Sequence, residues 1–241
     1  MIFKLTQMNT VHLKNIINEV IKLKIFEPIF HLFYLTSVFY MSFKMLEHSK
    51  NKKIIKLFGL MGLTLAAGDS FHLIPRIYAL LTTGLEAHSV SLGIGKLITS
   101  ITMTIFYAIL FRIWELRFEI KGDQKLRVFT GILVVTRIIL SIMPQNHWTL
   151  NNAPLSWGIY RNIPFTILGA LIVYLILQEA TKHKDEIFKK IGIAIIISFA
   201  CYLPVVLFAS TYRLVGMLMI PKTLAYLWVI YIGYKELMPS E

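Results

Sequence analysis

The sequence predicts an all-α, polytopic integral membrane protein with a bundle of seven transmembrane helices. Two features of its composition point to this class, since 56% of the 241 residues are hydrophobic and the mean hydropathy is +0.65. The third observation is that the apolar residues come in blocks of about 20, the length of helix that crosses the hydrocarbon core of a bilayer. Strands and soluble amphipathic helices would give shorter or alternating patterns.

Seven blocks of the chain are long and apolar enough to cross a membrane. The predicted spans are 26–46, 54–78, 89–113, 126–143, 156–178, 190–210 and 213–235, of which the fourth is the shortest. The first block begins near Phe26, and no small-residue cleavage site follows it, so we expect it to stay as a helix. Residues 26–241 are therefore predicted to form one seven-helix transmembrane domain.

Residues 1–25 are predicted to form an amphipathic segment that lies on the membrane surface. Between Val11 and Lys24, apolar side chains fall on one face of a helix. These side chains are Leu13, Ile16, Ile17, Val20 and Ile21. A frayed terminal tail is the alternative interpretation.

The distribution of positive charge predicts the orientation in the membrane. The formal net charge is +12, and alternate links between spans are basic. The basic links carry Lys50, Lys52, Lys53 and Lys56, then Arg112, Arg117, Lys121, Lys125 and Arg127, then Lys182, Lys184, Lys189 and Lys190, whereas links 79–88 and 144–155 carry neither Lys nor Arg. By the positive-inside rule the N-terminus is outside, and the C-terminus, with Lys235, is cytoplasmic. We expect a plasma (cytoplasmic) membrane location, with membrane lipids and no nucleic acid as partners.

A weak internal likeness suggests a three-plus-one-plus-three arrangement of the helices. The segments EPIF (27–30) and IPFT (163–166) each open a span with a proline, and a basic link followed by Gly59 or Gly192 occurs in each half. Parallel repeats of this kind are found in some transporters. Apolar sequences also produce such likeness by chance, so the repeat is a hypothesis.

Charged residues inside the second span indicate an internal site. The segment GDSFHLIPR (68–76) places Asp69, His72 and Arg76 at i, i+3 and i+7, which is one stripe of a helix. Gly62 and Ala66 continue this stripe, and small residues of this kind face other helices instead of lipid. Because ionisable side chains are costly in hydrocarbon, we expect these residues to have partners on other helices.

Four further spans place polar residues at a similar depth. Together with Asp69, His72 and Arg76, the candidate ligand-binding residues are Lys96, Ser100, Arg137, Arg161, Asn162, Lys222 and Tyr226. With a rise of 1.5 Å per residue, Asp69 and Lys222 are predicted to lie roughly 12 Å beneath the external interface. Lys96, Arg137, Arg161 and His72 are predicted to lie about 7–11 Å beneath it. We call the five cations Arg76, Lys96, Arg137, Arg161 and Lys222 the cationic layer. It is predicted to occupy the outer half of the bundle.

The cationic layer predicts a binding site for an anion. Its five positive charges face the single negative charge of Asp69, and Glu27 offsets one more. Because a surplus of buried cations is costly, the layer is a water-filled cavity, contains lysines neutralised by desolvation, or holds an anion. The planar guanidinium group suits carboxylate, phosphate or sulfate. We therefore expect a transporter-like or receptor-like protein for a small anion or an anionic lipid head group, with Asp69 holding His72 or Lys222 in place. In the structural alternative, Asp69 pairs with Lys222 and the arginines snorkel to the interface.

An intramembrane lipid-modifying enzyme, either a hydrolase or a transferase, is the alternative function. Its chemistry would use Ser100 as the nucleophile and His72 as the base, together with Asp69. The cationic residues would then hold a phosphate head group or stabilise developing negative charge. Turnover of a lipid substrate distinguishes this function from binding alone.

Two cofactor hypotheses are disfavoured by the sequence, so we expect no metal and no other cofactor. A metal ion held by Asp69 and His72 would sit among five cations, and a Schiff-base pigment on Lys222 would lack the motifs of such proteins. The single cysteine, Cys201, forms no intrachain disulfide. The possible protein partners are a second copy of the chain, in a homo-oligomer, or a separate cytoplasmic protein docked on the basic links.

Overall fold

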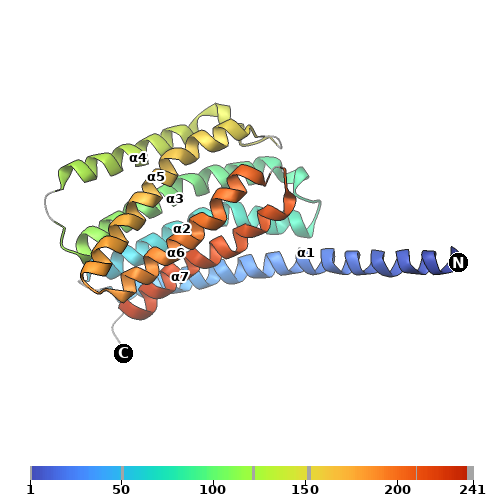
Figure 1. Cartoon of the computed structure of the whole chain (residues 1–241), viewed down its shortest axis with the longest axis horizontal. Coiled ribbons are helices and arrows are strands. Elements are labelled where there is room, and N and C mark those ends of the chain that lie inside the picture. The colour runs from blue at the N-terminus through green and yellow to red at the C-terminus, as the bar shows by residue number, and fades with distance from the viewer. Residues whose placement is uncertain (1, 50–51, 121–122, 151–152, 210, 238–241) are drawn as a thin grey trace.

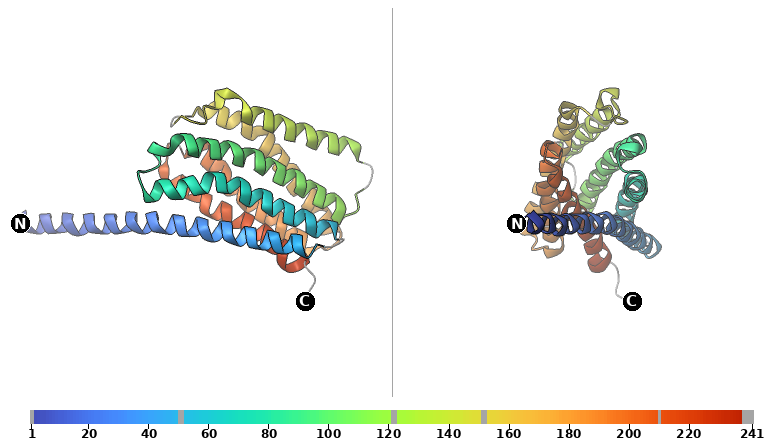
Figure 2. Two further views of the ribbon diagram at one scale, coloured as in Figure 1. Left: turned by 180° about the vertical axis from the view of Figure 1, so that it is seen from behind. Right: turned by 90° about the vertical axis from the view of Figure 1, so that its right-hand side faces the viewer.

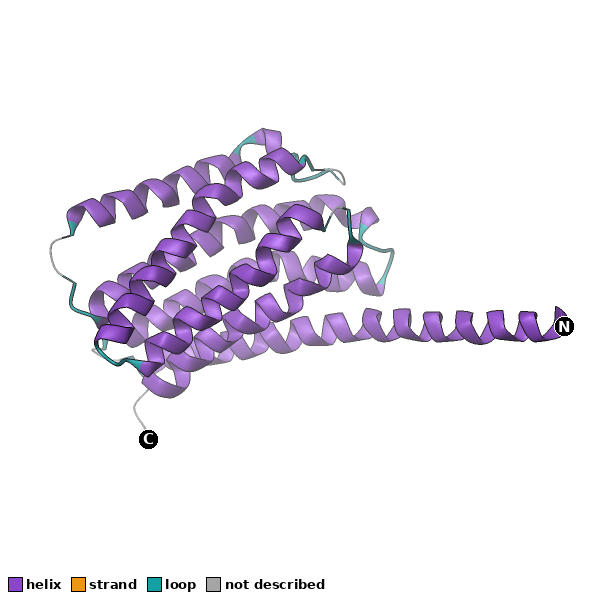
Figure 3. Cartoon of the chain, viewed as in Figure 1, coloured by secondary structure: helices purple, strands orange, loops and turns teal. Residues whose placement is uncertain are grey.

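The structure, a computed structural model of the chain, is all-helical in the ranges that it describes (Figure 3). These ranges are 2–49, 52–120, 123–150, 153–209 and 211–237, with the backbone alone for 2–24 and 213. Within them, seven α-helices and three 3₁₀ helices follow one another without any strand. Their bounds are α1 Ile2–Glu47, α2 Lys53–Leu81, η1 Glu86–His88, α3 Ser89–Arg117, α4 Gln124–Ile142, η2 Pro144–Asn146, α5 Leu155–Lys182, α6 Glu186–Phe208, η3 Arg213–Leu218 and α7 Met219–Leu237.

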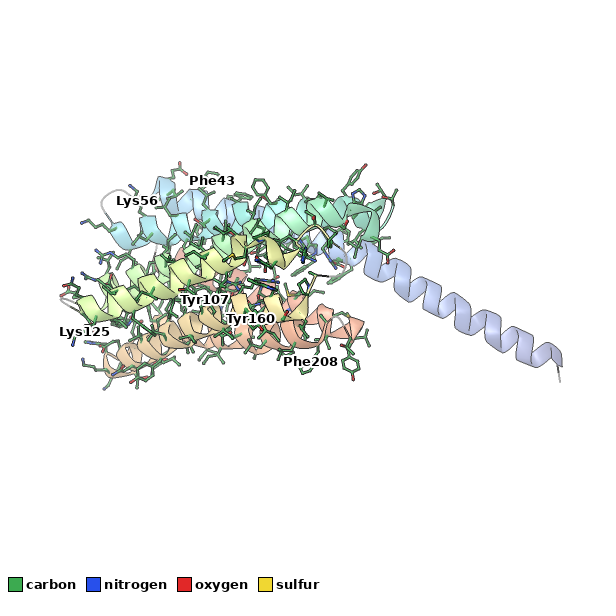
Figure 4. All side chains as sticks on the ribbon, turned by 90° about the horizontal axis from the view of Figure 1, so that it is seen from above. Phe43, Lys56, Tyr107, Lys125, Tyr160 and Phe208 are labelled. Carbon is green, nitrogen blue, oxygen red and sulfur yellow. The ribbon has the colours of Figure 1, made fainter. Side chains whose placement is uncertain are left out.

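The seven α-helices form one bundle in which each helix packs against its neighbours in the chain (Figure 1). α7 closes the bundle by packing against α1 and α2, and α4 lies at the periphery against α3 and α5 (Figure 2). Because successive helices run antiparallel, the three 3₁₀ helices share one end of the bundle, which we call the η end. We call the opposite end the basic end; Lys56 and Lys125 lie there, whereas Phe208 lies toward the η end (Figure 4).

Within the described ranges, six helical segments are long and apolar enough to cross a membrane. They are Ile25–Glu47, Lys53–Leu81, Glu86–Arg117, Leu155–Lys182, Glu186–Phe208 and Leu214–Leu237. Many of their large apolar side chains face outward, and Phe33, Ile74 and Tyr174 are each more than half exposed. Outward apolar side chains are what a lipid environment requires. The chain is therefore a multi-pass helical membrane protein, which confirms this part of the sequence prediction.

Apolar side chains fill the half of the bundle nearest the basic end. Phe58 and Phe188 are fully buried and meet edge to face, with ring centroids 6.4 Å apart. Ile113 and Ile176 are fully buried in the same cluster. Because lipid tails are as apolar as these side chains, the packing stabilises the bundle through dispersion and not through removal of apolar surface from water.

Ion pairs join α3 to its neighbours at the basic end. Glu115 is 6% exposed and accepts hydrogen bonds from Arg112 at 2.7 Å and from Arg127 of α4 at 2.5 Å. Arg117 donates to Asp185, which precedes α6, at 2.8 Å. Several cations of the predicted cytoplasmic links thus tie the helices together. Two further cations of those links, Lys50 and Lys121, lie outside the described residues.

Glu115→Gln is expected to lower the free energy of unfolding by about 1.5–3 kcal/mol, because a neutral amide replaces a buried carboxylate that receives two charged hydrogen bonds. Unfolding in a graded series of mild detergent and dodecyl sulfate mixtures measures this change. Glu47→Gln is the matched control, since Glu47 is 65% exposed and surface ion pairs contribute little. Equal stability of the two variants would contradict a structural role for Glu115.

Two helix bounds differ from the predicted spans for local reasons. α6 begins at Glu186 and not at 190, because the Asp185 carboxylate accepts hydrogen bonds of 3.1 Å from two backbone N–H groups of the first turn. α7 begins at Met219 and not at 213, since residues 213–218 form η3. Pro221 therefore lies in the first turn of α7, where its missing N–H leaves no intrahelical bond unmade.

The N-terminal segment is continuous with the first span. α1 runs from Ile2 to Glu47 as a single helix, and its first half extends beyond the rest of the bundle (Figures 1 and 2). The position of this half on a membrane surface stays a prediction. Pro28 and Pro164 both lie inside their helices. Neither proline marks the start of a helix, so the three-plus-one-plus-three arrangement stays a hypothesis.

Candidate functional site

Polar side chains of α1 and α2 face one another along a stripe that leads from the η end into the bundle. The residues are Glu27, His31 and Tyr34 on α1, and Asp69, His72 and Arg76 on α2. We call these six residues the polar ladder. Because the helices are antiparallel, Glu27 meets Arg76 nearest the η end and Tyr34 meets Asp69 deeper in the bundle. His31 and His72 lie within electrostatic range of each other between these two pairs, and we call the three pairs the outer, inner and middle rungs.

Direct hydrogen bonds close the outer and inner rungs of the polar ladder. In the outer rung, Arg76 Nε donates to Glu27 Oε1, and the two side chains are 31% and 25% exposed. In the inner rung, the fully buried Tyr34 hydroxyl donates to Asp69 Oδ2 at 2.7 Å. Glu27 thus offsets one cation, as predicted, and Asp69 has a tyrosine as its hydrogen-bond partner where the sequence predicts a histidine or lysine.

Two histidines form the middle rung, and each has an unpartnered nitrogen. His31 Nε2 lies 3.3 Å from Glu27 Oε1. His72 lies within electrostatic range of His31. Both Nδ1 atoms are buried and have no hydrogen-bond partner among the described residues. Because buried polar atoms are nearly always hydrogen-bonded, the middle rung is an unusual feature of the bundle.

Lys222 lies in an aromatic environment at the start of α7. The residue is 9% exposed, and its Nζ atom lies 4.8 Å from the ring centroid of Tyr202 and 5.5 Å from that of Tyr226. Asp69 is within electrostatic range of Lys222, but no described carboxylate lies within 4.0 Å of Nζ. The direct pair of Asp69 with Lys222, on which the structural alternative depends, is therefore not formed.

Hydroxyl groups connect the aromatic residues around Lys222. The hydroxyl groups of Tyr107 and Tyr226 lie 3.1 Å apart, and both residues are buried. Tyr202 donates to Asn162 Oδ1 at 2.8 Å. Tyr226 and Asn162 are among the residues that the sequence predicts for the site, whereas Tyr202 is not, because nothing in the sequence marks a tyrosine of α6 as facing inward.

Two arginines meet where α4 packs on α5. Arg137 is 2% exposed; its Nη1 donates to the backbone carbonyl of Arg161, and its guanidinium carbon lies 4.8 Å from the Phe165 ring centroid. The Nε of Arg137 has no hydrogen-bond partner among the described residues. Arg161 donates to Asn146 Oδ1 at 2.7 Å and lies 4.2 Å from the Trp148 ring centroid. Neutral groups and ring faces thus surround both guanidinium groups.

Lys96 of α3 lies between the cations of α2 and α5. Its side chain is exposed, and it is within electrostatic range of Arg76 and Arg161. No carboxylate of the described residues lies within 4.0 Å of its ammonium group. Lys96 therefore adds positive charge to the layer without a counter-charge.

Ser100 is engaged with α4 and not with the polar ladder. Its hydroxyl lies 3.0 Å from that of Ser141, which in turn donates to the backbone carbonyl of Arg137 at 2.8 Å. Neither His72 nor Asp69 is a hydrogen-bond partner of Ser100. The proposed nucleophile and base are not joined in this arrangement, and the enzymatic alternative stays a prediction without support from the geometry.

Positive charges outnumber negative charges in the candidate site. The cationic layer has five cations, and the described carboxylates near it are Glu27, which Arg76 engages, and Asp69, which Tyr34 engages. In the part of the chain that the structure describes, no three His, Cys, Asp or Glu side chains gather as a metal site would need. The arrangement is suited to a ligand that brings negative charge.

An apolar groove of about 470 Å³ between α1 and α7 is separate from the cationic layer. Its lining residues are Phe33, Ser37, Tyr40, Met41, Leu224, Leu227, Trp228, Tyr231 and Tyr234. None of these residues belongs to the polar ladder or the cationic layer. The groove therefore contributes nothing to the recognition of an anion.

Comparison with known proteins leaves the candidate site to be interpreted from its own geometry. Searches against protein-family models, curated protein sequences and solved structures each gave no match to this chain.

Proposed function

We propose that the protein binds a small anion or an anionic lipid head group in the cationic layer, as a transporter-like or receptor-like membrane protein. One observation carries the proposal. Lys96, Arg137, Arg161 and Lys222 each lack a described carboxylate within 4.0 Å of their charged nitrogens. An anion that enters the layer would supply the missing negative charge.

The neutral neighbours of these cations do not replace a counter-ion. A cation–π contact contributes about 0.5–2 kcal/mol. Removing an ion from water costs several kcal/mol, which is more than a single cation–π contact returns. Arginine does not lose its proton, so Arg137 and Arg161 carry their charge whether or not the site is filled. A bound carboxylate, phosphate or sulfate would offset that cost.

We propose α4 as a seventh membrane span with the η end outside the cell. Apolar side chains of α4 such as Ile132 and Val135 are more than half exposed, whereas Arg137 turns inward. Lys125 and Arg127 lie in its first turn at the basic end, where the positive-inside rule favours the cytoplasm. The N-terminus would then be external and the C-terminus cytoplasmic, in the plasma membrane. Partners would include membrane lipids, a second copy of the chain, or a separate protein at the basic end.

Small molecules that co-purify with the protein in mild detergent test the proposal. We expect mass spectrometry to detect a defined anionic species in the parent protein, and to find at least a tenfold smaller amount in an Arg161→Met, Lys222→Met double variant, about the loss that removal of one good ionic contact causes. A free anion and an anionic lipid differ in mass, so the same measurement separates the two sources.

A matched double variant, Lys182→Met with Lys189→Met, removes two cations at the basic end that pair with Glu179 and Glu186. It is expected to retain the anionic species in full. The proposal fails if neither the parent nor this control carries any anionic species, or if the Arg161 and Lys222 variant retains it.

A further inference from the structure

The polar ladder contains proton-carrying groups at every depth between the η end and Asp69, and anion binding does not require them. The outer rung holds the Glu27 carboxylate, which is 25% exposed, and the middle rung holds two imidazole groups. The inner rung ends at the Asp69 carboxylate, to which Tyr34 donates at 2.7 Å. Carboxylate and imidazole are the side chains that most readily exchange protons near neutral pH.

The geometry points to a proton path along the polar ladder, which carries a proton from water at the η end to the Asp69 carboxylate. The middle rung is the decisive part of the path. His31 lies against Glu27 at 3.3 Å through Nε2, and its buried Nδ1 has no partner among the described residues. His72 presents a second buried, unpartnered Nδ1 within electrostatic range of His31. A ring that uses one nitrogen and leaves the other free can take a proton on one side and release it on the other.

Charged and titratable groups from α1, α2, α3 and α7 act on Asp69 and His72. Asp69 faces Tyr34 and His31 of α1, and Lys222 and Tyr226 of α7. His72 faces His31 of α1, Arg76 of α2, and Lys96 and the Leu92 carbonyl of α3. The cations around His72 disfavour a charge resting there, so the middle rung would pass a proton on and not hold it. Lys222 favours the ionised form of Asp69, which leaves this carboxylate free to accept a proton when the pH falls.

Protonation of Asp69 would remove the negative charge opposite Lys222 and raise the net positive charge of the cationic layer. The affinity for an anion would then depend on the proton concentration at the η end, and this dependence rests on the proposed anion binding. The path itself does not rest on it. Movement of a proton to Asp69 requires no anion.

Infrared difference spectroscopy after a rapid drop in pH tests the path in the full-length protein without any added anion. Asp69→Asn assigns the carboxyl signal of Asp69. In His31→Phe, which keeps a ring of similar size, we expect that signal to appear about 100-fold more slowly than in the parent, the lower end of what a positioned proton carrier contributes. His72→Phe is expected to have the same effect and serves as the second variant if His31→Phe does not fold.

His88→Phe is the matched control, since His88 also lies at the η end but bonds to Thr83 outside the polar ladder. Its signal is expected to appear at the parental rate. The path is overturned if Asp69 gives no carboxyl signal at any pH, or if His31→Phe and His72→Phe both respond as fast as His88→Phe. A slowed response in a protein that binds no anion would support the path and reject the proposed function separately.

Discussion

Arg137→Met is expected to stabilise the ligand-free protein and to weaken anion binding at the same time. Arg137 is 2% exposed, has no described carboxylate beside it and leaves its Nε unpartnered. Replacing a buried ion pair by packed apolar side chains is neutral or stabilises a fold by about 1–4 kcal/mol, and an unpaired buried charge costs more to keep than a paired one. Loss of a buried charge that contacts a charged ligand weakens binding by roughly 30-fold or more. The measurements are thermal unfolding in mild detergent and titration calorimetry with sulfate and with short-chain phosphatidic acid.

Lys125→Met is the control for Arg137→Met, because Lys125 lies on the same helix but is exposed at the basic end. Both its stability and its affinity are expected to match those of the parent. Lower stability with unchanged affinity in Arg137→Met would instead assign Arg137 to holding α5 through the carbonyl of Arg161. The opposite signs of the two expected effects therefore separate a binding role from a structural one.

Gly95→Ala is expected to lower the free energy of unfolding by about 3 kcal/mol, the upper end of the cost of overpacking. A Cβ at this position would meet the carbonyl oxygen of Phe71 and the Cα of His72. Both are backbone atoms of α2, which cannot turn aside as a flexible side chain can. Separation of α2 from α3 would also displace the middle rung of the polar ladder. Unfolding in mild detergent and dodecyl sulfate mixtures measures the loss.

Gly131→Ala is the matched control for Gly95→Ala, since a Cβ on Gly131 would have no atom within 4 Å. Alanine has a higher helix propensity than glycine by about 0.8–1 kcal/mol, so this variant is expected to be at least as stable as the parent. A similar loss of stability in both variants would show that α2 and α3 do not depend on their close approach at Gly95.

The spans could be predicted from the sequence because each depends on a local property of the chain. Hydropathy over about 20 residues is enough to identify a membrane helix, whatever its neighbours are. The exception is α4, in which Lys125, Arg127 and Arg137 fall within 19 residues. Local composition does not tell whether such a helix crosses the membrane, because the environment of Arg137 depends on α5.

The sequence also determined which face of α2 is polar. Asp69, His72 and Arg76 share a stripe because the period of the helix is fixed, and the structure confirms that Asp69 and Arg76 have partners on another helix. The surplus of cations likewise follows from counting residues. The position of Glu27 near the external end of the first predicted span makes it the expected second counter-charge.

Only the tertiary structure decided which groups these side chains meet. Tyr34 is the partner of Asp69, and Ser141 is the partner of Ser100. Tyr202 and Tyr226 surround Lys222 in place of a carboxylate. The rotation of each helix about its axis and the angle at which it crosses its neighbours set these contacts, and both arise from packing over the whole bundle. The local sequence determines which side chains share one face of a helix. It does not determine which side chains of the neighbouring helices that face contacts.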